Sequence, residues 1–233
     1  MKLRMLFVTF LAAFSTATVS IPSQAADSAA NAGLVRVKSR NFEQFYVRPN
    51  TDLAGFRKIL IDPASVVFRK GWNKSKSVSQ RISPAEVARI ADEAAASVGS
   101  IFAESFEAQS YEIVATPGPG VLRLSLSLQD LYVNASDRTS AGVKSYTKAV
   151  GGATLHLDVY DATTGELLVR IVDHRKAEAT QASMANSVSN RFWLETMFRR
   201  WAAACAREFA ASKNRPLGTT TGFTGRGSTR VMG

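Results

Sequence analysis

Strict alternation of apolar and polar residues is the feature that most constrains the fold of this chain. Between residues 122 and 129 every second residue is a leucine, namely Leu122, Leu124, Leu126 and Leu128. The alternation resumes from Ala153 to Tyr160 and from Leu167 to Ile171. Because neighbouring side chains of a strand point to opposite faces, each segment predicts a β-strand with one dry and one solvated face. A sheet of this kind requires a second layer to cover its dry face.

Two longer segments have the apolar spacing of helices that cover such a sheet. Ser83-Pro84-Ala85-Glu86 predicts a helix start, because Ser83 can accept from the backbone at the third helical position and Pro84 fits the first. The apolar stripe that follows consists of Val87, Ile90, Ala91, Ala94, Val98, Ile101, Phe102 and Phe106. The second stripe consists of Phe192, Trp193, Met197, Trp201, Ala204, Cys205 and Phe209. The place of Cys205 in this stripe predicts a buried, unreactive thiol.

The remaining segments set the expected fold class. Lys58 to Arg69 predicts one strand with a kink at Pro63, and Tyr111 to Ala115 predicts a short strand. Asp161 to Gly165 is a tight connection between antiparallel strands, whereas residues 134–152 predict a long loop. We therefore predict an α+β fold, a two-layer α/β sandwich. Its mainly antiparallel sheet has about four to five strands, with both long helices packed on one face.

The start of the chain has the three parts of a cleavable secretion signal at residues 1–25. Met1 to Arg4 is basic, Met5 to Phe14 is apolar, and Ser23-Gln24-Ala25 places small residues at a cleavage site. Beyond this segment no apolar run approaches the roughly 20 residues that a membrane-spanning helix needs. The pattern predicts a protein exported to the periplasm or associated with the outer membrane, without a transmembrane span in its mature form.

Composition divides the rest of the chain into three parts. Residues 26–41 predict a flexible leader, residues 42–212 a single α/β domain, and residues 213–233 a disordered basic tail. The formal net charge is +10, and Lys213, Arg215, Arg226 and Arg230 lie in the tail without an acidic neighbour. This charge favours an anionic envelope component as partner and, through the tail, at most a weak peripheral membrane contact. Nucleic acid is not expected as a partner, because no basic platform lined by aromatic residues is present.

A set of short motifs in a fixed order resembles a known family. The motifs are Tyr46-Val47-Arg48-Pro49, Ile59-Leu60-Ile61-Asp62-Pro63 leading to Trp72, Pro117-Gly118-Pro119-Gly120-Val121-Leu122-Arg123-Leu124, and Asp161-Ala162-Thr163-Thr164-Gly165-Glu166-Leu167-Leu168 followed by Val172-Asp173. With this spacing, the chain from Phe42 to Phe209 resembles the bacterial envelope proteins of the domain of unknown function 3313. The resemblance implies a location in the cell envelope and supplies no catalytic residues.

Polar residues at two places on the predicted sheet are candidates for a surface site. His156 and Asp158 are two apart on one strand, so both point from the solvated face, where arginines of the neighbouring strands can lie close. Asp173-His174-Arg175-Lys176 at a strand end is a candidate anion contact. The surface candidates are Arg123, His156, Asp158, Arg170, Asp173 and His174. The same pattern is also typical of an ordinary solvated strand.

No constellation in the sequence demands a particular chemistry. The chain has two histidines, fewer than a histidine-based zinc site normally uses, and no Gly-x-Ser-x-Gly elbow. We predict no catalytic, cofactor or metal residues. The leading interpretation is a non-catalytic binding or accessory module that contacts another envelope component through the solvated sheet face or the loop at 134–152. The alternative is a hydrolase of cell-wall or polysaccharide substrates that uses His156, Asp158 and His174.

Overall fold

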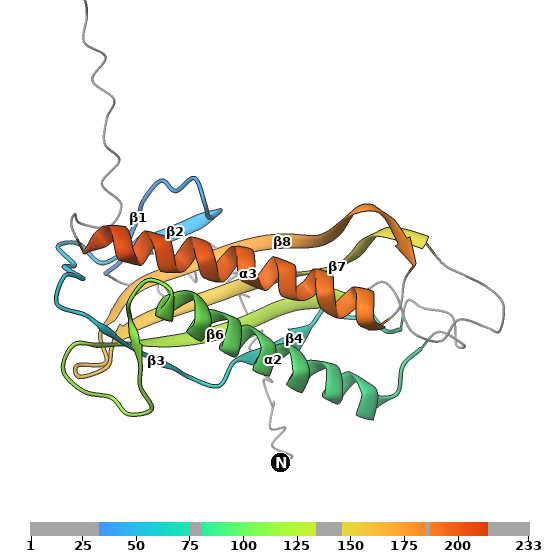
Figure 1. Ribbon diagram of the computed structural model, residues 1–233, viewed down its shortest axis with the longest axis horizontal. Coiled ribbons are helices and arrows are strands. Elements are labelled where there is room, and N and C mark those ends of the chain that lie inside the picture. Colours follow the sequence, from blue (N-terminus) through green and yellow to red (C-terminus); the bar gives the residue numbers. More distant parts are fainter. Residues whose placement is uncertain (1–32, 75–80, 134–145, 185–186, 214–233) are drawn as a thin grey trace, which may run out of the picture. The chain divides into compact units, whose positions relative to one another are not determined.

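The computed structural model describes residues 33–74, 81–133, 146–184 and 187–213, which form a sheet and two helices (Figure 1). The strands are β1 (Val35–Arg36), β2 (Gln44–Val47), β3 (Lys58–Ile61), β4 (Ser65–Phe68), β5 (Glu112–Ile113), β6 (Val121–Val133), β7 (Tyr146–Asp161) and β8 (Leu167–Met184). The helices are α2 (Pro84–Glu107) and α3 (Ser187–Ser212). The predicted signal at 1–25 and all of the predicted tail beyond Lys213 lie outside the described residues, whereas β1 lies within the segment predicted as a leader.

The strands form one mixed sheet of eight strands in the order β1-β2-β8-β7-β6-β3-β5, with β4 also paired to β6. In this order, the neighbouring strands β1, β2, β8, β7 and β6 pair antiparallel. β3 pairs with β5 and β6, and β4 pairs with β6, in parallel. The prediction of about four to five mainly antiparallel strands is therefore too small and misses the parallel part. The physical reason is the crossover through α2, which returns the chain to the sheet in the direction of β3.

Pro63 separates β3 from β4, and both strands run beside β6 in the same direction. Lys58 lies opposite Val121, and Ser65 lies opposite Ser127 further along β6. Proline has no amide hydrogen to donate to a sheet, so the ladder is interrupted at this point. The predicted strand with a kink is in fact two short strands along one neighbour.

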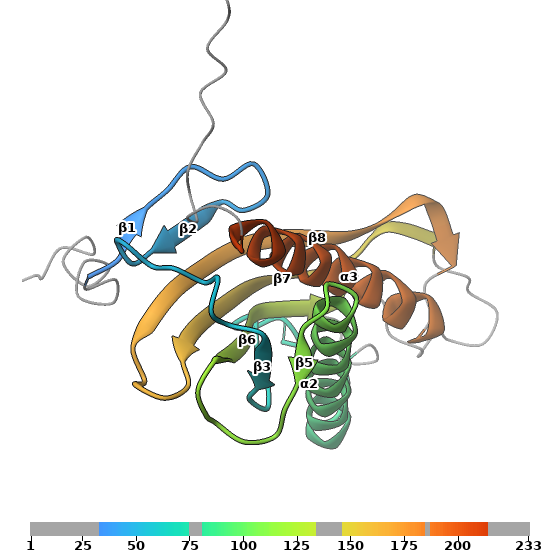
Figure 2. The same cartoon turned by 60° about the vertical axis from the view of Figure 1, so that its left-hand side comes forward.

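Both helices lie on the same face of the sheet, as Figure 2 shows. α2 begins where the sequence predicts, with Oγ of Ser83 accepting from the backbone N–H of Glu86 at 3.2 Å and Pro84 in the first turn. The two-layer part of the predicted fold is thus correct. Neither helix in the described part of the chain has the length and apolar composition that crossing a membrane requires.

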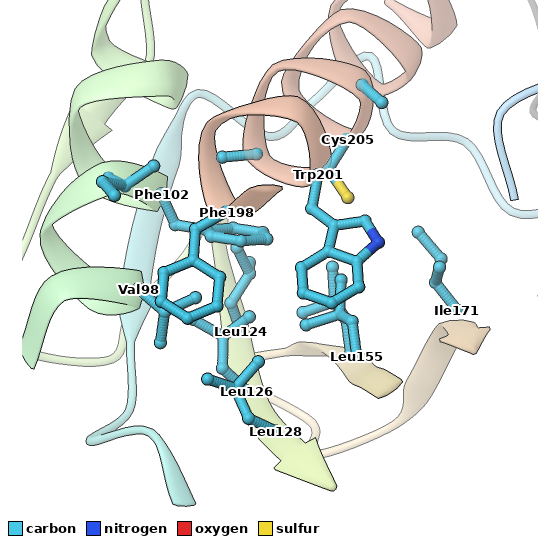
Figure 3. Packing of buried hydrophobic residues seen from close by; sticks show 14 of the residues in the cluster. Val98, Phe102, Leu124, Leu126, Leu128, Leu155, Ile171, Phe198, Trp201 and Cys205 are labelled. Atoms are coloured by element: carbon cyan, nitrogen blue, oxygen red, sulfur yellow. The ribbon is translucent and has the colours of Figure 1, made fainter. Parts of the chain in front are cut away.

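The core fills the space between the helices and the sheet. Figure 3 shows Phe198 and Trp201 of α3 pointing toward the leucines of β6 and β7, with Val98 and Phe102 of α2 beside them. All of these side chains are buried, and so is Cys205. Burial raises the pKa of the Cys205 thiol, which therefore stays protonated.

β7 begins at Tyr146, so the predicted loop at 134–152 is wrong for its second part, while its first part, 134–145, lies outside the described residues. The pair Gly151-Gly152 is typical of a loop, yet both residues belong to β7. Tyr132 of β6 lies against them and leaves no room for a side chain. A Cβ atom at Gly152 would lie 2.8 Å from Cε1 of Tyr132, and one at Gly151 would clash with the backbone oxygen of Tyr132. The close approach of the two strands requires glycine here.

Candidate functional site

The face of the sheet opposite the helices, which we call the open face, carries the candidate site. On β6, β7 and β8 most leucine, valine and isoleucine side chains are buried under the helices, and most residues between them point to the open face, where Val172 also lies. The open face carries every predicted surface candidate except Asp173. The candidates on it are Arg123, His156, Asp158, Arg170 and His174.

Asp158 and Arg170 lie directly opposite each other on β7 and β8 and form the central ion pair of the open face. Nε of Arg170 donates to Oδ1 of Asp158, and Nη2 donates to Oδ2, both at 2.6 Å. The two side chains are only 20% and 23% exposed, so solvent screens the pair in part. The hydrogen bond from Arg170 to Asp158 raises the pKa of Arg170. The fork geometry fixes both side chains in one orientation.

A second ion pair continues the arrangement toward β3. Nε of Arg123 donates to both carboxylate oxygens of Asp62, at 2.9 and 3.1 Å. The guanidinium of Arg123 lies 5.6 Å from the ring centroid of Tyr160, and the Tyr160 hydroxyl donates to Oδ2 of Asp158 at 3.3 Å. Burial and the neighbouring Asp158 raise the pKa of Tyr160. Asp62, Arg123, Tyr160, Asp158 and Arg170 thus form one connected set, which we call the polar row.

The sequence prediction missed two members of the polar row. Tyr160 is two residues after Asp158 on the same strand, and this spacing is a signal in the sequence that places both side chains on one face. Asp62 follows β3, and only the parallel register that sets Ile61 opposite Leu124 brings it beside Arg123. That register joins residues distant in sequence and has no local signal.

The two histidines share the open face but do not form one site. The ladder sets His156 opposite Val172 and His174 opposite Thr154, whose Oγ1 lies 3.1 Å from Nδ1 of His174. Burial lowers the pKa of His156, and the nearby Asp158 opposes this shift only in part, so the imidazole is neutral at physiological pH. Among the described residues, no cluster of His, Cys, Asp or Glu has the arrangement of a metal site.

Asp173 lies on the helix-covered face of β8 and is 4% exposed, so its prediction as a surface candidate is wrong. Its carboxylate accepts from Nε1 of Trp201 and Nε of Arg175, both at 2.7 Å, and from the backbone N–H of Glu43 at 2.9 Å. Asp173 has the parity of Val169 and Ile171, which also point to the helices. Its role is to connect α3, β8 and the segment before β2.

Three solved structures are similar to this chain over part of its length. The PelC dodecamer from Paraburkholderia phytofirmans is 11% identical, with 68% of this chain and 94% of that chain covered and a TM-score of 0.36. A protein of Xanthomonas campestris is 9% identical, with 76% and 93% covered and a TM-score of 0.38. A homolog of neuraminyllactose-binding hemagglutinin from Helicobacter pylori is 11% identical, with 66% and 82% covered and a TM-score of 0.35.

A comparison with curated proteins finds no match. The sequence does match a protein family over residues 24–205, a range that includes every strand and most of α3. This match confirms the resemblance carried by the motifs between Tyr46 and Asp173. The chain therefore belongs to the family described as protein of unknown function (DUF3313).

Proposed function

We propose that the protein is an exported, non-catalytic accessory module of the cell envelope that binds another envelope protein through the open face. The export part of this proposal is supported by the secretion signal predicted at residues 1–25. The binding part is supported by the polar row, which lies on the side of the sheet that neither described helix covers.

The polar row has the composition of a protein-binding surface. Tyrosine and arginine are enriched in protein interfaces and dominate their binding energy, and the row contains Tyr160, Arg123 and Arg170. Its side chains are already held by two ion pairs and a tyrosine hydrogen bond. Binding therefore costs less side-chain entropy than it would for free side chains. The balance of two acids and two arginines suits a protein partner of mixed charge.

The same contacts support a non-catalytic role. Asp62 and Asp158 each accept from an arginine at both oxygens, which uses part of the acceptor capacity that a general base directs at the proton of a substrate. The carboxylate next to His156 is the one held by Arg170, so it is not positioned to orient the imidazole as in a catalytic triad. These contacts do not favour the hydrolase alternative that uses His156, Asp158 and His174.

Photocrosslinking in living cells tests the binding proposal. A photoreactive residue replaces Ser127, which lies on the open face of β6 opposite His156, and a matched control replaces exposed Ser100 on the outside of α2. We expect a discrete adduct with one envelope protein from position 127 and none from position 100. The substitution Arg123→Glu in the same background, which reverses the charge beside Asp62, should abolish the adduct, whereas Arg123→Lys should preserve it.

Three outcomes contradict the binding proposal. They are no adduct at position 127, adducts of equal yield at positions 127 and 100, and an adduct that persists unchanged in the Arg123→Glu variant. Circular dichroism of each variant shows whether the fold is retained, so a lost adduct is not confused with a lost structure.

A further inference from the structure

A groove of about 430 Å³ beside α3 has four arginines in its lining. Arg199, Arg200 and Arg207 come from α3, and Arg175 comes from β8. Asn41 and Thr196 add an amide and a hydroxyl, and alanines of α3 form the floor. This surface lies on the helix side of the molecule, so it is separate from the open face, and the inference does not rest on the proposed function.

The helical repeat explains why these side chains gather in one stripe. Met197, Trp201 and Cys205 are buried against the sheet, so residues half a turn away point outward. Arg200 and Arg207 are seven positions apart, which places them two turns, or about 10 Å, apart along the axis. Ala203 lies between them and is too short to fill the space above the helix, which leaves the groove open.

The groove carries an excess of positive charge. Arg175 is fixed in place because its Nε donates to Asp173 at 2.7 Å and its Nη2 donates to the backbone oxygen of Asn41 at 2.9 Å. Arg199 forms an exposed ion pair with Glu104 at 3.1 Å. Within the described residues, Arg200 and Arg207 have no carboxylate partner, and no carboxylate lines the groove. The groove therefore attracts anions.

The spacing of the arginines indicates an extended ligand. Arg200 and Arg207 occupy helix positions about 10 Å apart, so a polymer with repeated anionic groups can contact each guanidinium with a different group. A concave groove also fits a chain lying in it better than it fits the plane of a bilayer. These two points favour a polyanion.

The other groups beside the arginines indicate a carbohydrate. Phe192, which is 59% exposed, does not line the groove but lies one turn before Thr196, whose hydroxyl donates to the Phe192 backbone oxygen at 2.8 Å. The Thr196 oxygen keeps acceptor capacity, and the Asn41 amide supplies both donors and acceptors for hydroxyl groups. An exposed aromatic ring offers an apolar surface to the C–H face of a sugar. We propose that this groove binds an acidic polysaccharide, with Arg200 and Arg207 contacting its carboxylates.

Binding of the full chain to oligogalacturonate, measured by isothermal titration calorimetry, tests the proposal. The double substitution Arg200→Gln and Arg207→Gln should weaken binding about a hundredfold or more, because it removes two charge-assisted hydrogen bonds. The matched control is Lys70→Gln with Lys74→Gln, which removes the same charge at exposed positions on the connection between β4 and α2. The control should bind within about twofold of the wild type, as expected for distant exposed charges.

The specificity of the site is tested with three further probes. We expect methyl-esterified oligogalacturonate, which keeps the sugar but loses the charge, to bind far more weakly. Single-stranded DNA and phosphatidylglycerol vesicles should show no dependence on Arg200 and Arg207. Equal losses in the two double variants would show non-specific attraction and overturn the proposal. DNA or vesicle binding that requires the two arginines, or unchanged affinity for the esterified sugar, would overturn it as well.

Discussion

Trp201 donates its indole N–H to Oδ2 of Asp173 at 2.7 Å, which joins the centre of α3 to the strand beneath it. The Asp173 carboxylate is buried, and Arg175 and the backbone of Glu43 complete its hydrogen bonds. A buried carboxylate with these partners is costly to remove, because the donors around it lose their acceptor. The pair therefore fixes the position of α3 along β8.

The substitution Asp173→Ala should lower the free energy of unfolding by about 3–5 kcal/mol, the range for breaking a buried ion pair on one side. Urea denaturation followed by tryptophan fluorescence measures the change. Asp158→Ala is the matched control, because its ion pair lies on the partly exposed open face and should cost closer to about 1 kcal/mol. A loss at Asp173 no larger than the loss at Asp158 would contradict the structural role given to Asp173.

The substitution Gly152→Ala should destabilise the protein by about 1–3 kcal/mol, the range for overpacking. The added methyl would lie 2.8 Å from Cε1 of Tyr132 and 3.0 Å from the backbone oxygen of Arg175. Thermal unfolding measures the effect. Gly99→Ala on α2 is the control, because nothing lies within 4 Å of its Cβ position, and we expect it to stabilise the helix by up to about 1 kcal/mol. Equal shifts of the same sign for both variants would refute the packing of Tyr132 on Gly152.

Burial of His156 predicts a defined pH dependence of stability. Its pKa in the folded protein is lowered from the ordinary value of 6.5, mainly by desolvation, so the unfolded chain takes up the proton more readily. The contribution of His156 to the free energy of unfolding is therefore fully present above pH 6.5. It is lost as the pH falls through the pKa that His156 has in the folded protein. Urea denaturation at about pH 7.5 and about pH 5 should show this loss, and His156→Gln should reduce it. The variant His174→Gln is the control and should show the same loss of stability as the wild type. A pH profile that His156→Gln leaves unchanged would contradict the role given to His156.

The predicted secretion signal has a direct test. The mature protein, isolated from the envelope fraction of cells that make the full chain, should begin at Ala26, because signal peptidase cleaves after small residues such as Ala25. N-terminal sequencing or intact-mass measurement gives the answer. Replacing Ala25 with a bulky residue such as arginine should block processing. A wild-type protein that starts at Met1 and stays in the cytoplasm would refute export.

Much of the helix layer and of the central sheet follows from local sequence. The Ser83 cap and the periodic stripe predict α2, and the leucines of β6 predict which face is dry. Side-chain parity also places Arg123, His156 and Asp158 on one face. Each of these inferences needs only residues close together in the chain, and the structure agrees with them.

Most of the errors have one physical origin, because the missing information lies in contacts between distant residues. The parallel pairing of β3 with β6 depends on the crossover through α2, so neither the size of the sheet nor the pairing of Asp62 with Arg123 was predicted. The glycines of β7 are typical of a loop in sequence, but they are needed in the strand because Tyr132 lies against them. Parity alone would have placed Asp173 with Ile171 on the covered face, but its charge suggested the surface.

The deep position of Cys205 has a practical consequence. A protonated thiol with no solvent contact reacts with alkylating reagents only after α3 separates from the strands beneath it. The rate of thiol labelling under native conditions therefore reports the free energy of that opening. The Cys205 thiol therefore serves as an internal reporter of the stability of the contact between α3 and the sheet.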